Sequence, residues 1–150
     1  MTAEEQLASF LAKFTPEIAA QAKACLARMR MRYPSAHELV YDNYNALAIG
    51  FCPSEKTSEA IFSIAVFPRW VSLFFLQNGT SLPDPERRLK GNGNVVRHIV
   101  LTTPSLLGER AVRELMLEAE ARAKVPFAAK GKGRLVIKSI SAKQRPRRPA

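Results

Sequence analysis

AIFSIAVFPRWVSLFFLQ, residues 60–77, decides the fold of this chain. Its two apolar runs are rich in β-branched and aromatic residues, which predicts two strands, and only Pro68 and Arg69 separate them. Side chains that are apolar on both faces are typical of strands in the middle of a covered sheet. A parallel return would need a crossover of about a dozen residues or more. The stretch therefore predicts an antiparallel hairpin.

Three further segments extend this sheet. ELVYDNYNALAIGF (38–51) alternates along its length and predicts one long strand with a wetter face near its start. VRHIVL (96–101) predicts a fourth strand. GRLVIKSIS (133–141) predicts an edge strand, in which Lys138 discourages pairing with another molecule.

Helical signals lie on both sides of these strands. A capping box at 2–5 and Thr-Pro pairs at 15–16 and 103–104 predict three helices, the second ending before Pro34 and the third at about Lys124. The elements together predict an α+β fold. We expect a two-layer sandwich, in which the N-terminal and C-terminal helices cover a mostly antiparallel sheet.

The length and the charge divide the chain into a domain and a tail. With 150 residues it suits one domain, which we place at 1–141, followed by a disordered basic tail at 142–150. The net charge is +10, yet residues 1–129 hold 15 basic and 13 acidic residues. The excess therefore belongs mainly to the C-terminal end. Arg28, Arg30 and Arg32 are expected to form a solvated helix end, where positive charge is favourable.

The cysteines and the N-terminus indicate a cytoplasmic protein. Cys25 and Cys52 form no C-x-x-C pair and have no nearby histidine, so their spacing supports neither a zinc site nor a redox pair. Acidic residues stand where a secretory signal would carry lysines, and no apolar stretch is long enough to span a bilayer. We expect no association with a membrane.

RRLKGNGNVVRHIV (87–100) concentrates positive charge around two glycines. It follows a predicted short helix at 84–90, and it is neither a P-loop nor a dinucleotide fingerprint, because a strand follows the glycines where those motifs need a helix. One interpretation is a helix-terminating glycine followed by a bulged strand entry. The other is an anion site, in which the glycines allow positive φ and the amides form a nest. Its candidate residues are Arg87, Arg88, Lys90, Gly91, Gly93 and Arg97.

Arg97 favours the anion site because an arginine on an apolar strand needs a planar acidic partner. Asp42, Glu38 and Asp84 are candidate partners within the chain, and a ligand oxyanion is the alternative. His98 faces the opposite way from Arg97, so we interpret it as a hydrogen-bonded core residue and not as an acid or base.

No catalytic constellation emerges from the rest of the chain. There is no G-x-S-x-G nucleophile elbow and no close pair of carboxylates, so the sequence favours a non-enzymatic protein. Aromatic residues at strand spacing can stack on nucleic-acid bases, but in apolar runs they are expected to belong to the core. These residues are Tyr41, Tyr44, Trp70, Phe74 and Phe75.

The order of ELVYDNYNALAIGF, SIAVFPRWVSLFFL, LPDPERRLKGNGNVVRHIVL and GRLVIKSIS resembles the small bacterial YdhG-like family, a domain of unknown function. The resemblance covers roughly residues 20–141, and the G-x-G-x-x-x-R-H turn that enters a strand is its most specific part. It implies a two-layer arrangement similar to frataxin. One branch of the family is regarded as an intracellular iron chaperone, which implies iron as a possible cofactor.

These observations lead to one preferred hypothesis and two rivals. The preferred one is a binding or accessory protein that engages an anionic ligand or nucleic acid through the 87–98 loop and the basic tail. The alternative implied by the resemblance is an iron-binding chaperone. A third hypothesis is an enzyme that acts on a small anionic substrate beneath the long loop. The sequence offers no residue that we can name as its base or nucleophile.

Overall fold

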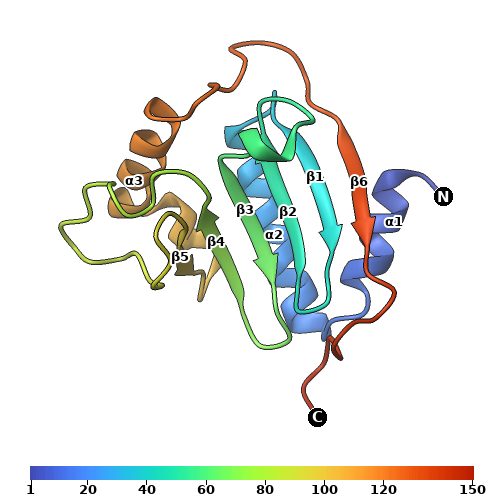
Figure 1. Ribbon diagram of the computed structural model, residues 1–150. Coiled ribbons are helices and arrows are strands. Elements are labelled where there is room, and N and C mark those ends of the chain that lie inside the picture. Colours follow the sequence, from blue (N-terminus) through green and yellow to red (C-terminus); the bar gives the residue numbers. More distant parts are fainter.

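The computed structural model describes residues 1–150 and has the predicted α+β fold (Figure 1). Three helices pack on a six-stranded mixed sheet with the strand order β5-β4-β3-β2-β1-β6. The α-helices are α1 (Ala3–Leu11), α2 (Pro16–Arg32) and α3 (Arg110–Ala121), and two short 3-10 helices are η1 (Thr57–Glu59) and η2 (Pro104–Gly108). The strands are β1 (His37–Asp42), β2 (Leu47–Cys52), β3 (Phe62–Val66), β4 (Val71–Phe75), β5 (Arg97–Val100) and β6 (Leu135–Ile140).

The first two helices begin where the capping signals predict. The Thr2 hydroxyl accepts a hydrogen bond from the Glu5 amide at 3.1 Å, and the Glu5 carboxylate accepts one from the Thr2 amide at 2.9 Å. Thr15 caps α2 in the same way, by accepting from the Ile18 amide at 3.3 Å. The third prediction is partly wrong, because residues 104–108 form η2 and α3 begins only at Arg110.

The predicted hairpin lies in the middle of the sheet. β3 and β4 pair antiparallel from Phe62↔Phe75 to Val66↔Val71, and the Phe67 amide donates to the Trp70 carbonyl at 2.9 Å across the turn. Only two residues stand between these turn positions, so the chain has no room for another connection. The hairpin prediction is confirmed.

The long strand predicted at 38–51 is wrong, because the chain turns at 43–46 and forms β1 and β2. These strands pair antiparallel, and the Asn43 amide donates to the Ala46 carbonyl at 3.0 Å. Asp and Asn favour turns since their side chains tolerate turn geometry. The alternation of side chains continues through the turn and so hides it in the sequence. The residues that point into the core nevertheless change from even to odd numbers, because Val40 of β1 and Leu47 of β2 lie in the same core.

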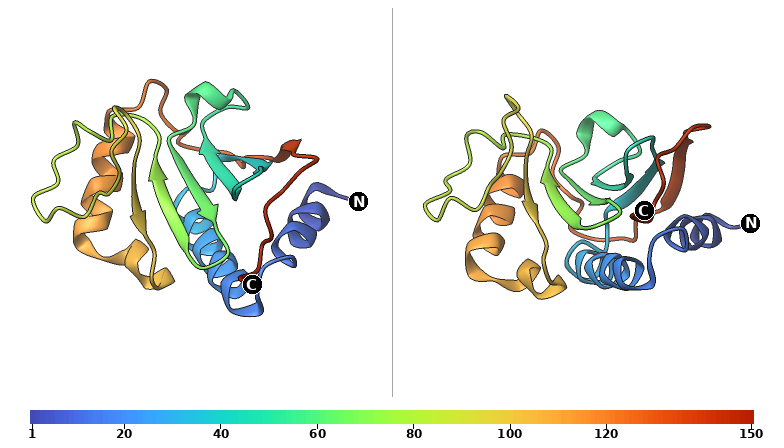
Figure 2. Two further views of the ribbon diagram at one scale, coloured as in Figure 1. Left: turned by 60° about the horizontal axis from the view of Figure 1, so that its bottom comes forward. Right: turned by 90° about the horizontal axis from the view of Figure 1, so that it is seen from below.

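The helices cover only one face of the sheet, as Figure 2 shows from two directions. Phe62, Ile64 and Leu73 point toward the helices and are buried in the main core. The opposite face, which we call the open face, carries the residues of the other parity. Above β2 and β3 it is partly covered by the segment around η1, where the Cys52 thiol donates to the Lys56 carbonyl at 3.1 Å (Figure 1). The remaining part has no helix over it.

The edge strand at the C-terminal end is confirmed. β6 pairs parallel with β1, with an irregularity between Val40 and Tyr41, and has no neighbour on its other side. The sheet ends there, beside α1. No helix of the chain is long and apolar enough to cross a membrane.

Candidate anion-binding site

The loop before β5 folds back on the sheet without forming a helix. The predicted helix at 84–90 is wrong, because the Asp84 carboxylate accepts hydrogen bonds from the Arg88 amide at 2.8 Å and the Leu89 amide at 2.9 Å. Arg87 takes a positive φ of 54°. Lys90 then pairs with His98 in an isolated antiparallel bridge, with N–O distances of 2.7 and 3.0 Å. The loop thus adds one residue pair to the edge of the sheet.

Gly91 and Gly93 play different parts in this turn. Gly91 has a φ of +111°, which side-chain-bearing residues rarely adopt, whereas Gly93 is not among the positive-φ residues. The amides of 91–93 donate no hydrogen bond within the protein. Three exposed amides are therefore free to meet an external acceptor.

Arg97 has no carboxylate partner. Its guanidinium donates to the carbonyls of Gly93 and Val96, so it closes the loop upon itself. The three proposed internal partners are wrong: Glu38 binds Arg30, Asp42 binds Arg147 and Lys13, and Asp84 caps the loop amides. Backbone carbonyls satisfy this arginine instead.

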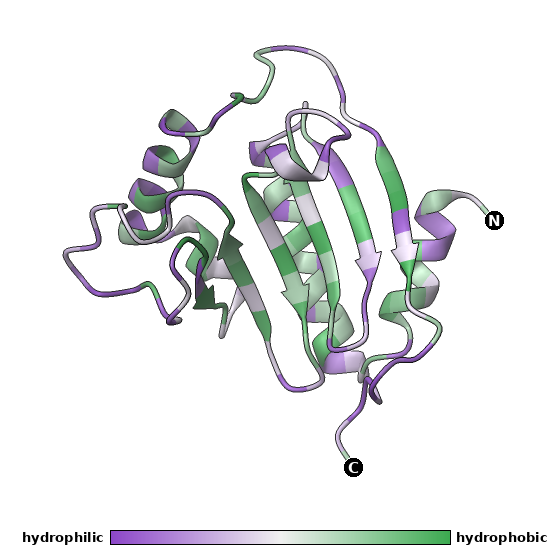
Figure 3. Cartoon of the chain, viewed as in Figure 1, coloured by the Kyte–Doolittle hydropathy of each residue, from purple (hydrophilic) through white to green (hydrophobic).

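The four cations of the loop differ in their partners. Arg88 contacts Glu109 and lies 3.9 Å from Glu86, so its charge is neutralised within the protein. Arg87 and Lys90 are exposed and form no ion pair. Figure 3 shows the loop and the C-terminal tail as hydrophilic segments beside the apolar strands.

Lys90 lies in a row of residues that crosses the open face. Residues paired directly across antiparallel strands point to the same face. Lys90 pairs with His98, His98 with Phe74, and Phe74 with Ser63. The loop therefore places one free cation beside an aromatic pair, since the rings of His98 and Phe74 stack at 5.0 Å.

The next row of the open face has small residues at its centre. Ser72 pairs with Ala65, Ala65 with Ala48, and Ala48 with Tyr41. Ser72 and Ala65 are buried, at 0% and 6% exposure. The row is thus formed by small residues at its centre, with Val100 beyond Ser72 and Tyr41 beyond Ala48.

The aromatic residues are mostly not in the core, contrary to expectation. Phe75 is buried, but Tyr41 and Phe74 are half-buried, and Tyr44 and Trp70 are 42% and 43% exposed. Trp70 and Phe74 have the parity of Ser72, which places them on the face without helices. Trp70 stacks on Phe67 with ring centroids 5.1 Å apart. The signal in the sequence is the apolar pattern at residues 71, 73 and 75, which faces the core and leaves residues 70, 72 and 74 to the other side of the sheet.

His98 is half-buried and lacks the hydrogen-bonded core role we expected. Its side chain appears in no hydrogen bond, and burial lowers the pKa of the imidazole from its ordinary value. The ring is therefore neutral at pH 7. It acts as an aromatic surface beside Phe74.

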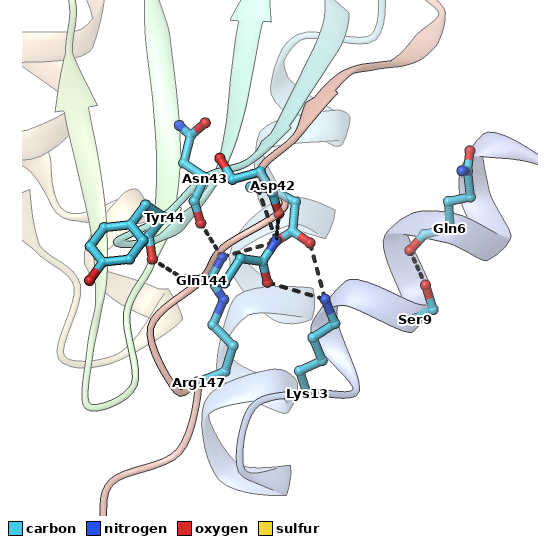
Figure 4. Close-up of polar contacts among 9 residues, drawn as sticks. Gln6, Ser9, Lys13, Asp42, Asn43, Tyr44, Gln144 and Arg147 are labelled. Atoms are coloured by element: carbon cyan, nitrogen blue, oxygen red, sulfur yellow. Dashed lines mark hydrogen bonds and ion pairs between the residues drawn. The ribbon is translucent and has the colours of Figure 1, made fainter.

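The basic tail packs against the sheet at a buried carboxylate (Figure 4). Arg147 is 5% exposed and donates to Asp42 at 2.9 Å, while the Lys13 ammonium lies 3.2 Å from the other carboxylate oxygen. Gln144 donates to the Asp42 carbonyl at 3.1 Å. The expectation of disorder throughout 142–150 is wrong at these positions, because β1 supplies a partner that tail composition does not reveal.

The partners of Asp42 keep its carboxylate charged. Burial raises the pKa of Asp42, but contacts with Gln144, Arg147 and Lys13 outweigh that effect and leave the pKa below its ordinary value. The tail arginine at this site is thus structural.

No group of three or more His, Cys, Asp or Glu side chains is arranged to hold a metal ion. Both thiols are buried, and burial raises the pKa of Cys25 to about 11. The iron-chaperone alternative therefore rests on the resemblance alone.

Comparison with known proteins found no matching family model, no similar curated protein and no similar solved structure. The resemblance to the YdhG-like family stays a prediction.

Proposed function

We propose that this chain is a non-enzymatic binding protein for single-stranded nucleic acid, with bases on the open face and the 87–98 loop beside the phosphate backbone. The proposal rests on one observation: a free cation and a pair of stacked rings lie in the same row of the sheet. Lys90, a free cation, is paired with His98, which stacks on Phe74. The proposal keeps the anionic partner expected from the sequence and names its chemistry.

The loop supplies what a phosphate backbone needs. Arg87 and Lys90 are exposed and have no carboxylate partner, and the amides of 91–93 are unused. Arg69, in the β3–β4 turn next to Trp70, is a further exposed cation without an ion pair. Cations and free amides bind phosphate oxygens without reading sequence.

The open face supplies what unpaired bases need. Aromatic side chains on an uncovered sheet stack on successive bases, and such stacking tolerates any sequence because every base has a π-face. Trp70 and Phe74 lie on this face, separated by the small Ser72. Ser72 and Ala65 are buried, so bases are proposed to stack on the exposed parts of Trp70 and Phe74 themselves.

The test is fluorescence anisotropy with a labelled oligothymidine, over a series of salt concentrations. Trp70→Ala with Phe74→Ala should weaken binding by about 1–3 kcal/mol for each base that loses its stack. Leu117→Ala, which removes an apolar side chain that is 55% exposed on the helix side, is the matched control and should bind normally. Equal affinity for all three proteins would refute the proposal.

A further inference from the structure

A hollow of about 330 Å³ lies between α2, η2 and α3, on the helix side of the molecule. Three arginines line it: Arg28 and Arg32 from α2, and Arg113 from α3. No acidic residue lines it. This groove is separate from the open face, because the helices lie on the opposite side of the sheet (Figure 2).

The three arginines differ from the other helix arginines in having no ion-pair partner. Arg30, between two of them in sequence, lies 2.9 Å from the Glu38 carboxylate. On α3, Arg110 lies 4.0 Å from Glu114. The guanidinium groups of α2 and α3 that have no ion pair are therefore gathered at the groove. The sequence-based interpretation of Arg28 and Arg32 as a merely solvated helix end misses Arg113, which α3 brings across from another part of the chain.

Methionine and leucine form the apolar part of the groove. Met29 and Met116 are each 1% exposed, Leu107 is 5% exposed, and Met31 at the rim is 85% exposed. Methionine is flexible and polarizable, so it adapts to side chains of different shapes. Methionine and arginine are also enriched in protein–protein interfaces, where arginine is a frequent hot-spot residue.

We infer that this groove binds an acidic peptide segment of a partner protein, with an aliphatic side chain against the exposed Met31 and carboxylates on the three arginines. Charge complementarity selects the acidic partner, because three cations face the groove and no carboxylate does. The lining contains no aromatic ring on which a base would stack, so the open face suits nucleic acid better. The inference does not depend on the nucleic-acid proposal.

The probe is a short fluorescein-labelled helical peptide with leucines at every third and fourth position and glutamates elsewhere. Arg28→Ala with Arg113→Ala should weaken its binding at least about tenfold. Arg110→Ala with Lys124→Ala removes the same charge from exposed positions outside the groove and should change the affinity less than about twofold. Circular dichroism of each variant checks that the helices remain folded.

Two further measurements separate the contributions. Met31→Ala should weaken the binding of the acidic peptide without changing how the affinity depends on salt, because the substitution removes only an apolar contact. A peptide with lysines in place of glutamates should not bind. The inference is overturned if the lysine peptide binds equally well, if the arginine variant binds like its control, or if oligothymidine displaces the peptide. Normal oligothymidine binding by the arginine variant shows that the two sites are independent.

Discussion

The 87–98 loop and the 142–150 tail are both rich in cations, but the buried tail arginine Arg147 and the exposed loop cations Arg87 and Lys90 differ in how their charges are used. In the tail, the side chain of Arg147 is 3% exposed and bonded to Asp42. In the loop, Arg87 and Lys90 are exposed and form no ion pair. The difference lies in the carboxylates, because β1 supplies a buried aspartate to Arg147, whereas Arg87 and Lys90 have no carboxylate partner.

This comparison shows that the number of cations in a segment does not identify its available charge. Glu38 and Asp42 both point from β1 toward the helices, and each holds an arginine from elsewhere in the chain, Arg30 and Arg147. A cation bound in this way contributes to stability. Arg87 and Lys90, which have no such partner, are the loop cations that we propose to meet a phosphate.

The largest effect is expected from removing the buried carboxylate that holds the tail. Asp42→Asn leaves Arg147 and Lys13 without their anion, and removing one member of a buried ion pair costs about 3 kcal/mol of unfolding free energy. Urea denaturation measures this loss. Glu55→Gln, at the exposed pair with Arg134, should cost less than about 1 kcal/mol. Equal small losses in both variants would mean that the tail contact is no stronger than a surface pair.

The next effect concerns the aromatic surface beside the loop. Trp70→Ala alone should weaken oligothymidine binding by about 1–3 kcal/mol, because one base loses its stacking partner. Anisotropy at fixed salt gives the affinity, and the salt slope should stay unchanged because no cation is lost. A changed slope with unchanged affinity would contradict the stacking role.

The pH dependence of the unfolding free energy tests the structural role of Asp42. Its folded pKa lies below the unfolded value of about 3.9, so the ionised group stabilises the fold above that value, and the contribution is lost as the pH falls through the folded pKa. Urea unfolding at a series of acidic pH values should show the gap between the natural chain and Asp42→Asn narrowing toward low pH. A gap that is constant with pH would contradict the assigned charge state.

The smallest effect is expected from the loop charges. Arg87→Ala with Lys90→Ala should reduce the slope of the logarithm of the binding constant against the logarithm of salt by about 1.4, since each single-strand phosphate contact contributes about 0.7. Lys143→Ala with Arg145→Ala removes two exposed tail cations and should leave the slope unchanged. The reverse result would assign phosphate binding to the tail.

Local signals predicted the starts of α1 and α2 and the central hairpin, because the caps at Thr2 and Thr15 and the short β3–β4 connection depend only on neighbouring residues. The β1–β2 turn was missed since alternation continues through residues 43–46. The remaining features of the site depend on contacts between residues far apart in the sequence. The bridge of Lys90 to His98 and the burial of Arg147 on Asp42 join residues that no local pattern connects.

The most direct test of the central claim uses the fluorescence of Trp70, the only tryptophan in the chain and one that is 43% exposed on the open face. Titration with unlabelled oligothymidine should quench it saturably, with an affinity that falls as salt rises and that weakens in Arg87→Ala with Lys90→Ala. Binding detected by anisotropy without any change in tryptophan fluorescence would place the nucleic acid elsewhere and contradict the account.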